Sequence, residues 1–401
     1  MKKGVVFITL ALQLIFAWAL VDSFDSVCIL LFAGLAFFQF CYFDHRAAKL
    51  TTYMFVLWIF TYYIPVTEMG MYYTSEQVFT DSNFYDFYAL RFSDYSFKEI
   101  IKLSDVTWQS TFVVSFYAFI YKIFGKILLV PVIINLYLVY LSLYLIKIKS
   151  ITKNIHIWLV YLMSIFASTI YIMPGKDILT TLFLAILMSL SFSKYTIIRQ
   201  SIVTLFCFSA SLFNRLNSLP LLFFLELRRI RKIFSIKHLI PMGALSLILF
   251  FVIESELSFY LDIQTMVDRQ RENTQFSKAL VDVLLPRNMG LYFLVTPLRF
   301  IAYLISPFPF YNKLFETYWN VNTYFFYFQL GKFISGGCWV YIIGELTFTY
   351  KRYNKRLVFI LLMIPLMIST VQLLQGGRYR VVCDLFYFWV LTTYYQKKRL
   401  Y

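Results

Sequence analysis

The stretch IHIWLVYLMSIFASTIYIMPGKDILTTLFLAILMSLSFS, residues 155–193, decides the fold class. It contains two apolar runs, 155–173 and 177–193, separated only by a proline, a glycine and a lysine. Because a helix needs about 20 mainly apolar residues to cross a bilayer, this stretch predicts two membrane-spanning helices. The three residues between them predict a tight hairpin.

The same pattern recurs along the whole chain. The 401 residues are 60% hydrophobic and 14% charged, whereas soluble domains are usually about half apolar. Aromatic residues reach 21%, and such side chains suit bilayer interiors and interfaces. We therefore expect an all-α, polytopic integral membrane protein, and a soluble enzyme is excluded. The candidate spans are 4–22, 27–43, 50–66, 127–146, 155–173, 177–193, 197–213, 216–227, 237–254, 322–344, 356–374 and 381–396.

The positive-inside rule places two further apolar stretches, 108–124 and 286–311. If 108–124 spans the bilayer, the basic cluster at 147–153 lies outside. If it instead lies along the outer surface or re-enters it, every basic cluster between spans becomes cytoplasmic, and orientation explains the formal charge of +16 without nucleic acid as a partner. We therefore predict about 12 transmembrane helices, outer-face surface or re-entrant helices, and both termini in the cytoplasm.

Residues 1–401 form a single multi-pass membrane domain in this interpretation, because no repeat or linker divides them. Most residues outside the spans fall in two outer segments, 67–126 and 255–321, which are expected to form the active-site vestibule. The five cysteines show no CxxC spacing and the three histidines stand singly. No metal site is expected from either.

Asp81 and Asp86 stand among aromatic residues in TDSNFYDFYALRF, residues 80–92, beyond the third span. A carboxylate at a membrane surface can act as a general base or hold a divalent cation. The competing interpretation is a solvated loop in which Asp81 caps a helix.

Lys176 opens a span directly after Pro174 and Gly175. Exposed amides at a helix start, with a lysine beside them, suit an anion such as phosphate; the alternative is a hairpin with an interfacial ion pair. Arg215, in SLFNRLN (211–217), lies at membrane depth or at its outer edge. A charge there faces a cavity or a partner by default, unless it snorkels to the surface.

The second outer segment carries basic residues against the positive-inside trend, and a polyanionic ligand would explain them. Arg269 and Arg271, in MVDRQREN (266–273), could hold diphosphate oxygens together. Arg299 has apolar neighbours and is the least easily neutralised locally. The alternative is pairing with acidic residues of the same segment.

A double glycine precedes Arg378 and Arg380 in QLLQGGRYRVVCDLF, residues 372–386. The glycines allow a ligand to approach the backbone closely, and both arginines would face the outer vestibule. Asp384, one turn beyond Arg380, is its expected salt-bridge partner. Arg378 is then the ligand-facing arginine.

Four places in the sequence together resemble the GT-C superfamily of glycosyltransferases that use polyprenyl-linked sugars, including O-antigen and capsule repeat-unit polymerases (Wzy-like). These places are DSNFYDFYA (81–89), the stretch 108–138 beginning WQSTFVVSFYAF, PGKDILTTLFL (174–184) with LFNRLN (212–217), and GGRYRVVCDLFYFW (376–389).

The resemblance implies a catalytic or cation-binding carboxylate at Asp81 or Asp86, and a lipid diphosphate held by Arg215, Arg299 and Arg378. The donor would be a polyprenyl-diphosphate-linked glycan and the acceptor another glycan, at the outer face of the bacterial inner membrane, in lipopolysaccharide O-antigen or capsule assembly. Only one acidic outer motif is clear, which favours the metal-independent polymerase branch and no cofactor. A divalent cation at Asp81 and Asp86 stays an open alternative, and other polysaccharide-assembly proteins are candidate partners.

Two other functions compete with repeat-unit polymerisation. One is transfer of a single sugar in the same pathway. The other is a flippase for lipid-linked oligosaccharide, which should show repeat symmetry and charges at mid-span in both halves. A membrane acyltransferase would need a buried catalytic histidine, whereas His45, His156 and His238 are all expected at cytoplasmic ends.

Overall fold

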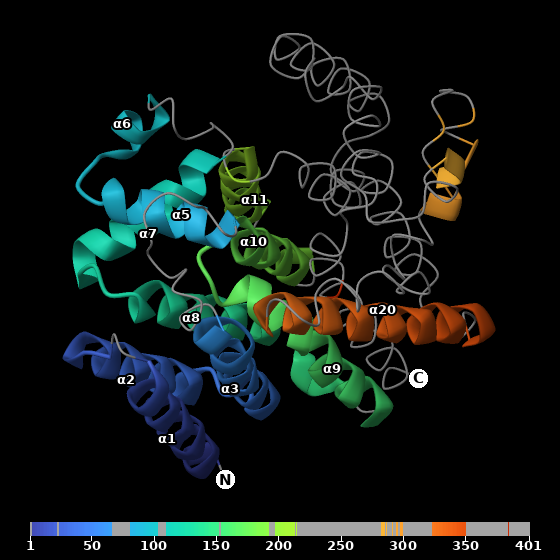
Figure 1. Cartoon of the computed structure of the whole chain (residues 1–401), viewed down its shortest axis with the longest axis horizontal. Coiled ribbons are helices and arrows are strands. Elements are labelled where there is room, and N and C mark those ends of the chain that lie inside the picture. Colours follow the sequence, from blue (N-terminus) through green and yellow to red (C-terminus); the bar gives the residue numbers. More distant parts are fainter. Residues whose placement is uncertain are drawn as a thin grey trace.

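The computed structural model describes residues 2–21, 24–65, 81–102, 110–151, 154–191, 197–212 and 323–349, together with 214, 282–284, 286, 291, 294–295, 297–299 and 384. All regular structure in these residues is helical (Figure 1), which confirms the all-α prediction. The elements are α1 (Lys2–Leu20), α2 (Ser26–Cys41), α3 (His45–Trp58) with a π-helical turn (Ile59–Tyr63), α5 (Asp81–Arg91), α6 (Phe97–Ile101), α7 (Thr111–Phe124), α8 (Leu129–Leu145), a 3-10 turn (Ile148–Ser150), α9 (Asn154–Tyr171), α10 (Lys176–Ser191), α11 (Ile197–Leu212) and α20 (Thr323–Thr349).

The first seven predicted spans, from 4–22 to 197–213, and the span 322–344 coincide with helices of the described chain. The predicted spans 216–227, 237–254 and 356–374 lie outside the described residues, as does 381–396 apart from Asp384. The helices α1 and α9 are long and apolar enough to cross a membrane, and α7 with α8 would add a third span if the pair were one broken helix.

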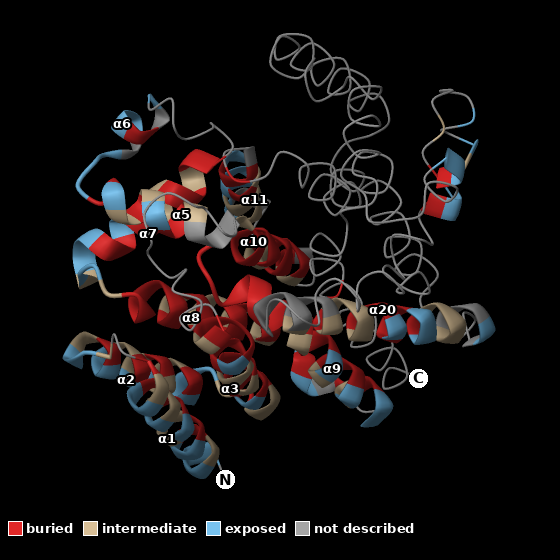
Figure 2. Ribbon diagram, in the orientation of Figure 1, coloured by how far each residue is buried: buried red, intermediate tan, exposed pale blue. Residues whose placement is uncertain are grey.

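Large apolar side chains lie on the outside of the described helices. Trp18 on α1, Leu30 on α2 and Ile202 on α11 are 73%, 74% and 63% exposed. Figure 2 shows exposed residues along α1, α2 and α9, whereas α8 and α10 are buried over most of their length. Apolar surface of this extent is unfavourable in water, and lipid contact removes that cost.

The loops at one end of the helices are joined through Asp44. One carboxylate oxygen of Asp44 caps α3 by accepting from the backbone N–H groups of Arg46 at 3.0 Å and Ala47 at 3.3 Å. The other accepts from the backbone N–H of Lys149 at 3.3 Å. The backbone N–H of Asp44 donates to the phenol oxygen of Tyr140 on α8 at 3.0 Å. The α2–α3 loop and the α8–α9 loop therefore lie at the same end of the helices.

Helices α9 and α20 pack closely against each other. His156, near the start of α9, lies 2.7 Å from the carboxylate of Glu345, near the end of α20, so the two helices run antiparallel. A Cβ atom added at Gly331 of α20 would lie 3.1 Å from the Cα of Phe166 on α9. The absent side chain therefore allows the two backbones to approach.

Gly331→Ala is expected to destabilise the protein by roughly 1–3 kcal/mol, because the new methyl group pushes against backbone that cannot yield without moving a helix. Gly337→Ala on the same helix is the matched control, since a Cβ there meets no atom within 4 Å. Thermal unfolding in detergent should show a lower Tm for the first variant only. Equal Tm values for the two variants would contradict the close packing of α9 and α20.

Helix α7 does not continue into α8. The two helices are bent by 117° at a break that contains Gly125, whose φ of 90° is readily adopted by glycine. Helix α5 packs against α7, and α8 packs against α10. The bend therefore directs α7 away from α8 and towards α5 (Figure 1).

Candidate functional site

Asp86 is a buried carboxylate between two short helices. It lies on α5, is 3% exposed, and accepts a hydrogen bond from the phenol of Tyr121 on α7. Burial raises the pKa of Asp86 to about 7, although the hydrogen bond from Tyr121 acts in the opposite direction. A carboxylate with a pKa near neutrality is suited to accept a proton during catalysis.

Tyr117 binds the turn before α10 to the face of α7 that also carries Tyr121. It lies four residues before Tyr121, so both phenols project from one side of the helix. Its hydroxyl donates to the side-chain oxygen of Asn135 on α8 at 2.8 Å and accepts from the backbone N–H of Gly175 at 3.4 Å. The amide of Asn135 in turn donates to the carbonyl of Ile172 at 2.9 Å. The turn 172–175 is thus held by side chains of both α7 and α8.

Lys176 extends from this turn to the helix that carries Asp86. Its ammonium nitrogen lies 5.4 Å from the ring centre of Tyr85, the residue next to Asp86 on α5, which is within the range of a cation–π contact. The side chain is only partly buried. The ammonium group of Lys176 therefore contacts the same helix, α5, that carries the carboxylate of raised pKa.

Asp177 follows Lys176 and is fully buried. Within the described residues, no group of three or more His, Cys, Asp or Glu side chains is arranged to hold a metal ion. The open prediction of a divalent cation at Asp81 and Asp86 stays untested, because the side chain of Asp81 is not among those described.

The end of α11 is fastened to the start of α10 by Asn214. Its side-chain NH₂ donates to the carbonyl oxygen of Lys176 and to the hydroxyl oxygen of Thr180, each at 3.0 Å. Asn214 directly precedes Arg215 in the sequence. Parts of three predicted motifs, 81–89, 174–184 and 212–217, are therefore joined by one set of contacts.

The predicted site residues do not all meet. Lys176 contacts the ring of Tyr85, the neighbour of Asp86 on α5, and Asp81 is the first residue of that helix. Arg299 is fully buried and donates to the carbonyl oxygen of Leu284 at 3.4 Å. The described parts of the segment 282–299, coloured orange in Figure 1, lie apart from α5 and α7. The predicted ligand residues outside the described chain are Arg215, Arg269, Arg271, Arg378 and Arg380.

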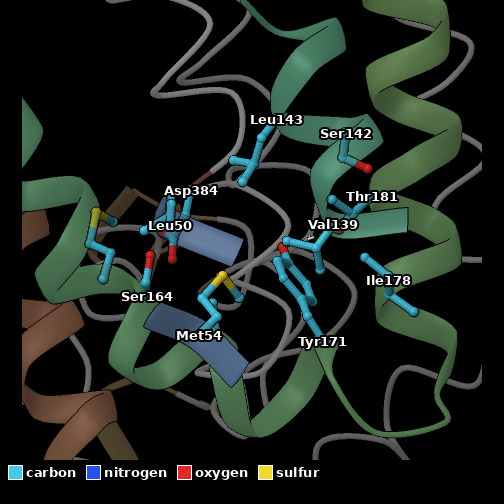
Figure 3. Close-up of a pocket in the computed structure, with 12 residues that line it drawn as sticks. Leu50, Met54, Val139, Ser142, Leu143, Ser164, Tyr171, Ile178, Thr181 and Asp384 are labelled. Carbon is cyan, nitrogen blue, oxygen red and sulfur yellow. Dashed lines mark hydrogen bonds between the residues drawn. The ribbon is translucent and has the colours of Figure 1, made fainter. Parts of the chain in front are cut away.

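A cavity of about 30 Å³ lies in the core between α3, α8, α9 and α10 (Figure 3). Its lining is mainly apolar and includes the polar side chains of Ser142, Ser164, Thr181 and Asp384. Asp384 accepts a hydrogen bond from the indole N–H of Trp339 on α20 at 2.6 Å. The salt bridge predicted between Asp384 and Arg380 involves a residue outside the described chain.

Tyr121→Phe is expected to raise the pKa of Asp86 above about 7, because it removes the one hydrogen bond that favours the charged carboxylate. If Asp86 accepts a proton in the reaction, the acid limb of the kcat/KM profile should move to higher pH. The measurement is a pH–rate profile of both proteins. Tyr95→Phe is the control, since that exposed tyrosine should leave the profile unchanged. If the acid limb of the Tyr121→Phe profile does not move, that limb does not report the ionisation of Asp86.

No family model, no characterised protein and no solved structure matches this chain.

Proposed function

We propose that the protein transfers glycosyl groups from a polyprenyl-diphosphate-linked glycan, as a repeat-unit polymerase of cell-surface polysaccharide. The observation that carries this proposal is the buried carboxylate of Asp86, with a pKa of about 7, on a helix whose Tyr85 ring contacts the ammonium group of Lys176. The first suits removal of a proton from an acceptor hydroxyl, and the second suits a departing diphosphate. The resemblance of the four sequence motifs to polyprenyl-sugar enzymes points to the same chemistry.

The proposed topology has about 12 spans with both termini in the cytoplasm. The contact of Asp44 with Lys149 supports it, because the α2–α3 and α8–α9 loops lie at one end of the helices. If 108–124 crossed the bilayer, these loops would lie on opposite sides. The basic residues of both loops make that end cytoplasmic by the positive-inside rule. The turn 172–175 is then at the outer face of the membrane, and α7 lies along that face.

In the proposed reaction, an acceptor sugar hydroxyl attacks the anomeric carbon of the lipid-linked sugar. The new bond forms between that carbon and the acceptor oxygen while the bond to the diphosphate oxygen breaks, which inverts the anomeric centre. The hydroxyl proton passes to Asp86, and the negative charge that develops on the diphosphate is stabilised by Lys176. Arg215 is the arginine we propose to assist it, since Asn214, its neighbour, bonds to the Lys176 carbonyl.

The deciding experiment combines a deletion strain with the purified protein. In the strain, loss of polymer with accumulation of single repeat units on the lipid supports polymerisation. Loss of one sugar from every unit would instead indicate a single-sugar transferase. In liposomes that contain lipid-linked repeat units, formation of glycosidic bonds supports transfer. Translocation of the units without bond formation would identify a flippase and overturn the proposal.

A further inference from the structure

The amide of Asn214 has a fixed orientation. Its NH₂ group faces the carbonyl oxygen of Lys176, and a carbonyl can only accept, so the nitrogen must lie on that side. The hydroxyl of Thr180 donates to the same carbonyl at 2.9 Å, which leaves its oxygen free to accept from Asn214. The side-chain oxygen of Asn214 is therefore directed away from these two groups on α10.

Two buried polar atoms at this turn lack a hydrogen-bond partner in the described part of the chain. They are the side-chain oxygen of Asn214 and the hydroxyl of Ser211, and both residues are fully buried. The backbone N–H of Asn214 donates to the carbonyl of Ser211 at 3.3 Å, so the two residues belong to one turn. Buried polar groups without partners are rare in folded proteins, and two in one turn call for an explanation.

We propose that Ser211 and Asn214 form a subsite for a hydroxyl group of the sugar bonded directly to the lipid diphosphate. This inference rests on the proposed glycosyl transfer. A sugar hydroxyl can donate to the amide oxygen of Asn214 while it accepts from the hydroxyl of Ser211. A phosphate oxygen would be repelled by the amide oxygen, because both are acceptors. Asn214 bonds to the backbone carbonyl of Lys176, the residue whose ammonium group is proposed to hold the leaving group, so we assign the subsite to the sugar next to the diphosphate and not to the far end of the glycan.

Ser211→Ala separates this role from a structural one. Removing a buried hydroxyl that has no partner is neutral or stabilising for the fold, so the Tm should be unchanged or higher. Loss of one hydrogen bond to substrate should raise KM for the lipid-linked repeat unit by about 3- to 10-fold. The assay measures polymer formation by the purified full-length protein in liposomes, with lipid-linked repeat units extracted from a strain that lacks the protein.

The matched control is Ser142→Ala on α8. Its hydroxyl is also buried but donates to the carbonyl oxygen of Leu138 at 2.7 Å, so it already has a partner within its own helix and this variant should leave KM unchanged. If the wild-type protein forms polymer and Ser211→Ala keeps the wild-type KM, the subsite is wrong while the proposed function stands. If the wild-type protein forms no glycosidic bond, both proposals fail.

Discussion

Asp86→Asn is expected to stop polymer formation, with turnover reduced by roughly 10²- to 10⁴-fold, the usual contribution of a general base. Asparagine keeps the shape of the side chain and can still accept from Tyr121, but it cannot take up the acceptor proton. The measurements are surface glycan length in a complemented deletion strain and turnover of the purified protein. Polymer of wild-type length would exclude Asp86 as the base.

The matched control for this variant is Asp94→Asn. Asp94 follows α5 and lies 3.9 Å from the ammonium of Lys126, but its side chain is 79% exposed. A pair in such a position contributes little to stability, and the carboxylate of Asp94 is exposed, unlike that of Asp86. Polymer length should therefore be that of the wild-type protein.

Loss of activity in Asp86→Asn should be accompanied by a gain in stability at high pH. Burial raises the pKa of Asp86 from 3.8 to about 7 in the folded protein. Folding therefore takes up a proton between these values, and the stability that is complete below about pH 4 is lost as the pH rises through about 7. The shift corresponds to about 4 kcal/mol. At pH 8 the Tm of the variant should exceed that of the wild-type protein, and near pH 4 the two should converge.

Lys176→Met is expected to produce the second largest loss, with kcat reduced by about 10²- to 10³-fold. Methionine can keep a contact with the ring of Tyr85 but removes the positive charge proposed to stabilise the diphosphate. Lys176→Arg should retain a measurable part of the activity. Lys126→Met is the control, because that lysine belongs to an exposed pair with Asp94. If Lys176→Met and Lys126→Met behave alike in the turnover assay, Lys176 has no part in the reaction.

The lengths of the apolar runs and the charges between them predicted the helices well, because both are properties of local sequence. The hairpin at 174–176 is the clearest case, since α9 and α10 flank it as expected. Within the candidate site, Asp86 and Lys176 could be named from their residue types and their places next to spans. The choice between Asp81 and Asp86 could not be made, because it depends on which of them the rest of the fold buries.

Sequence reasoning missed the side chains that join the site, which are those of Tyr117, Asn135 and Asn214. The bond from Tyr117 to Asn135 crosses 18 residues and that from Gly175 to Tyr117 crosses 58, and no local pattern encodes such pairings. One signal was present: Tyr117 and Tyr121 stand four residues apart on a predicted surface helix, so their hydroxyls share a face. In LFNRLN the charge of Arg215 pointed to that residue, whereas the described contacts are made by the neutral side chain of Asn214.

The contact of Asp44 has a consequence for the timing of biosynthesis. The oxygen that caps α3 finds its partners within three residues, but the other oxygen bonds to an N–H group 105 residues later in the chain. At a synthesis rate of 5–20 residues per second, that partner emerges roughly 5 to 20 s afterwards. During this interval the α2–α3 loop lacks this contact, and it is joined to the α8–α9 loop only after α8 has been synthesised.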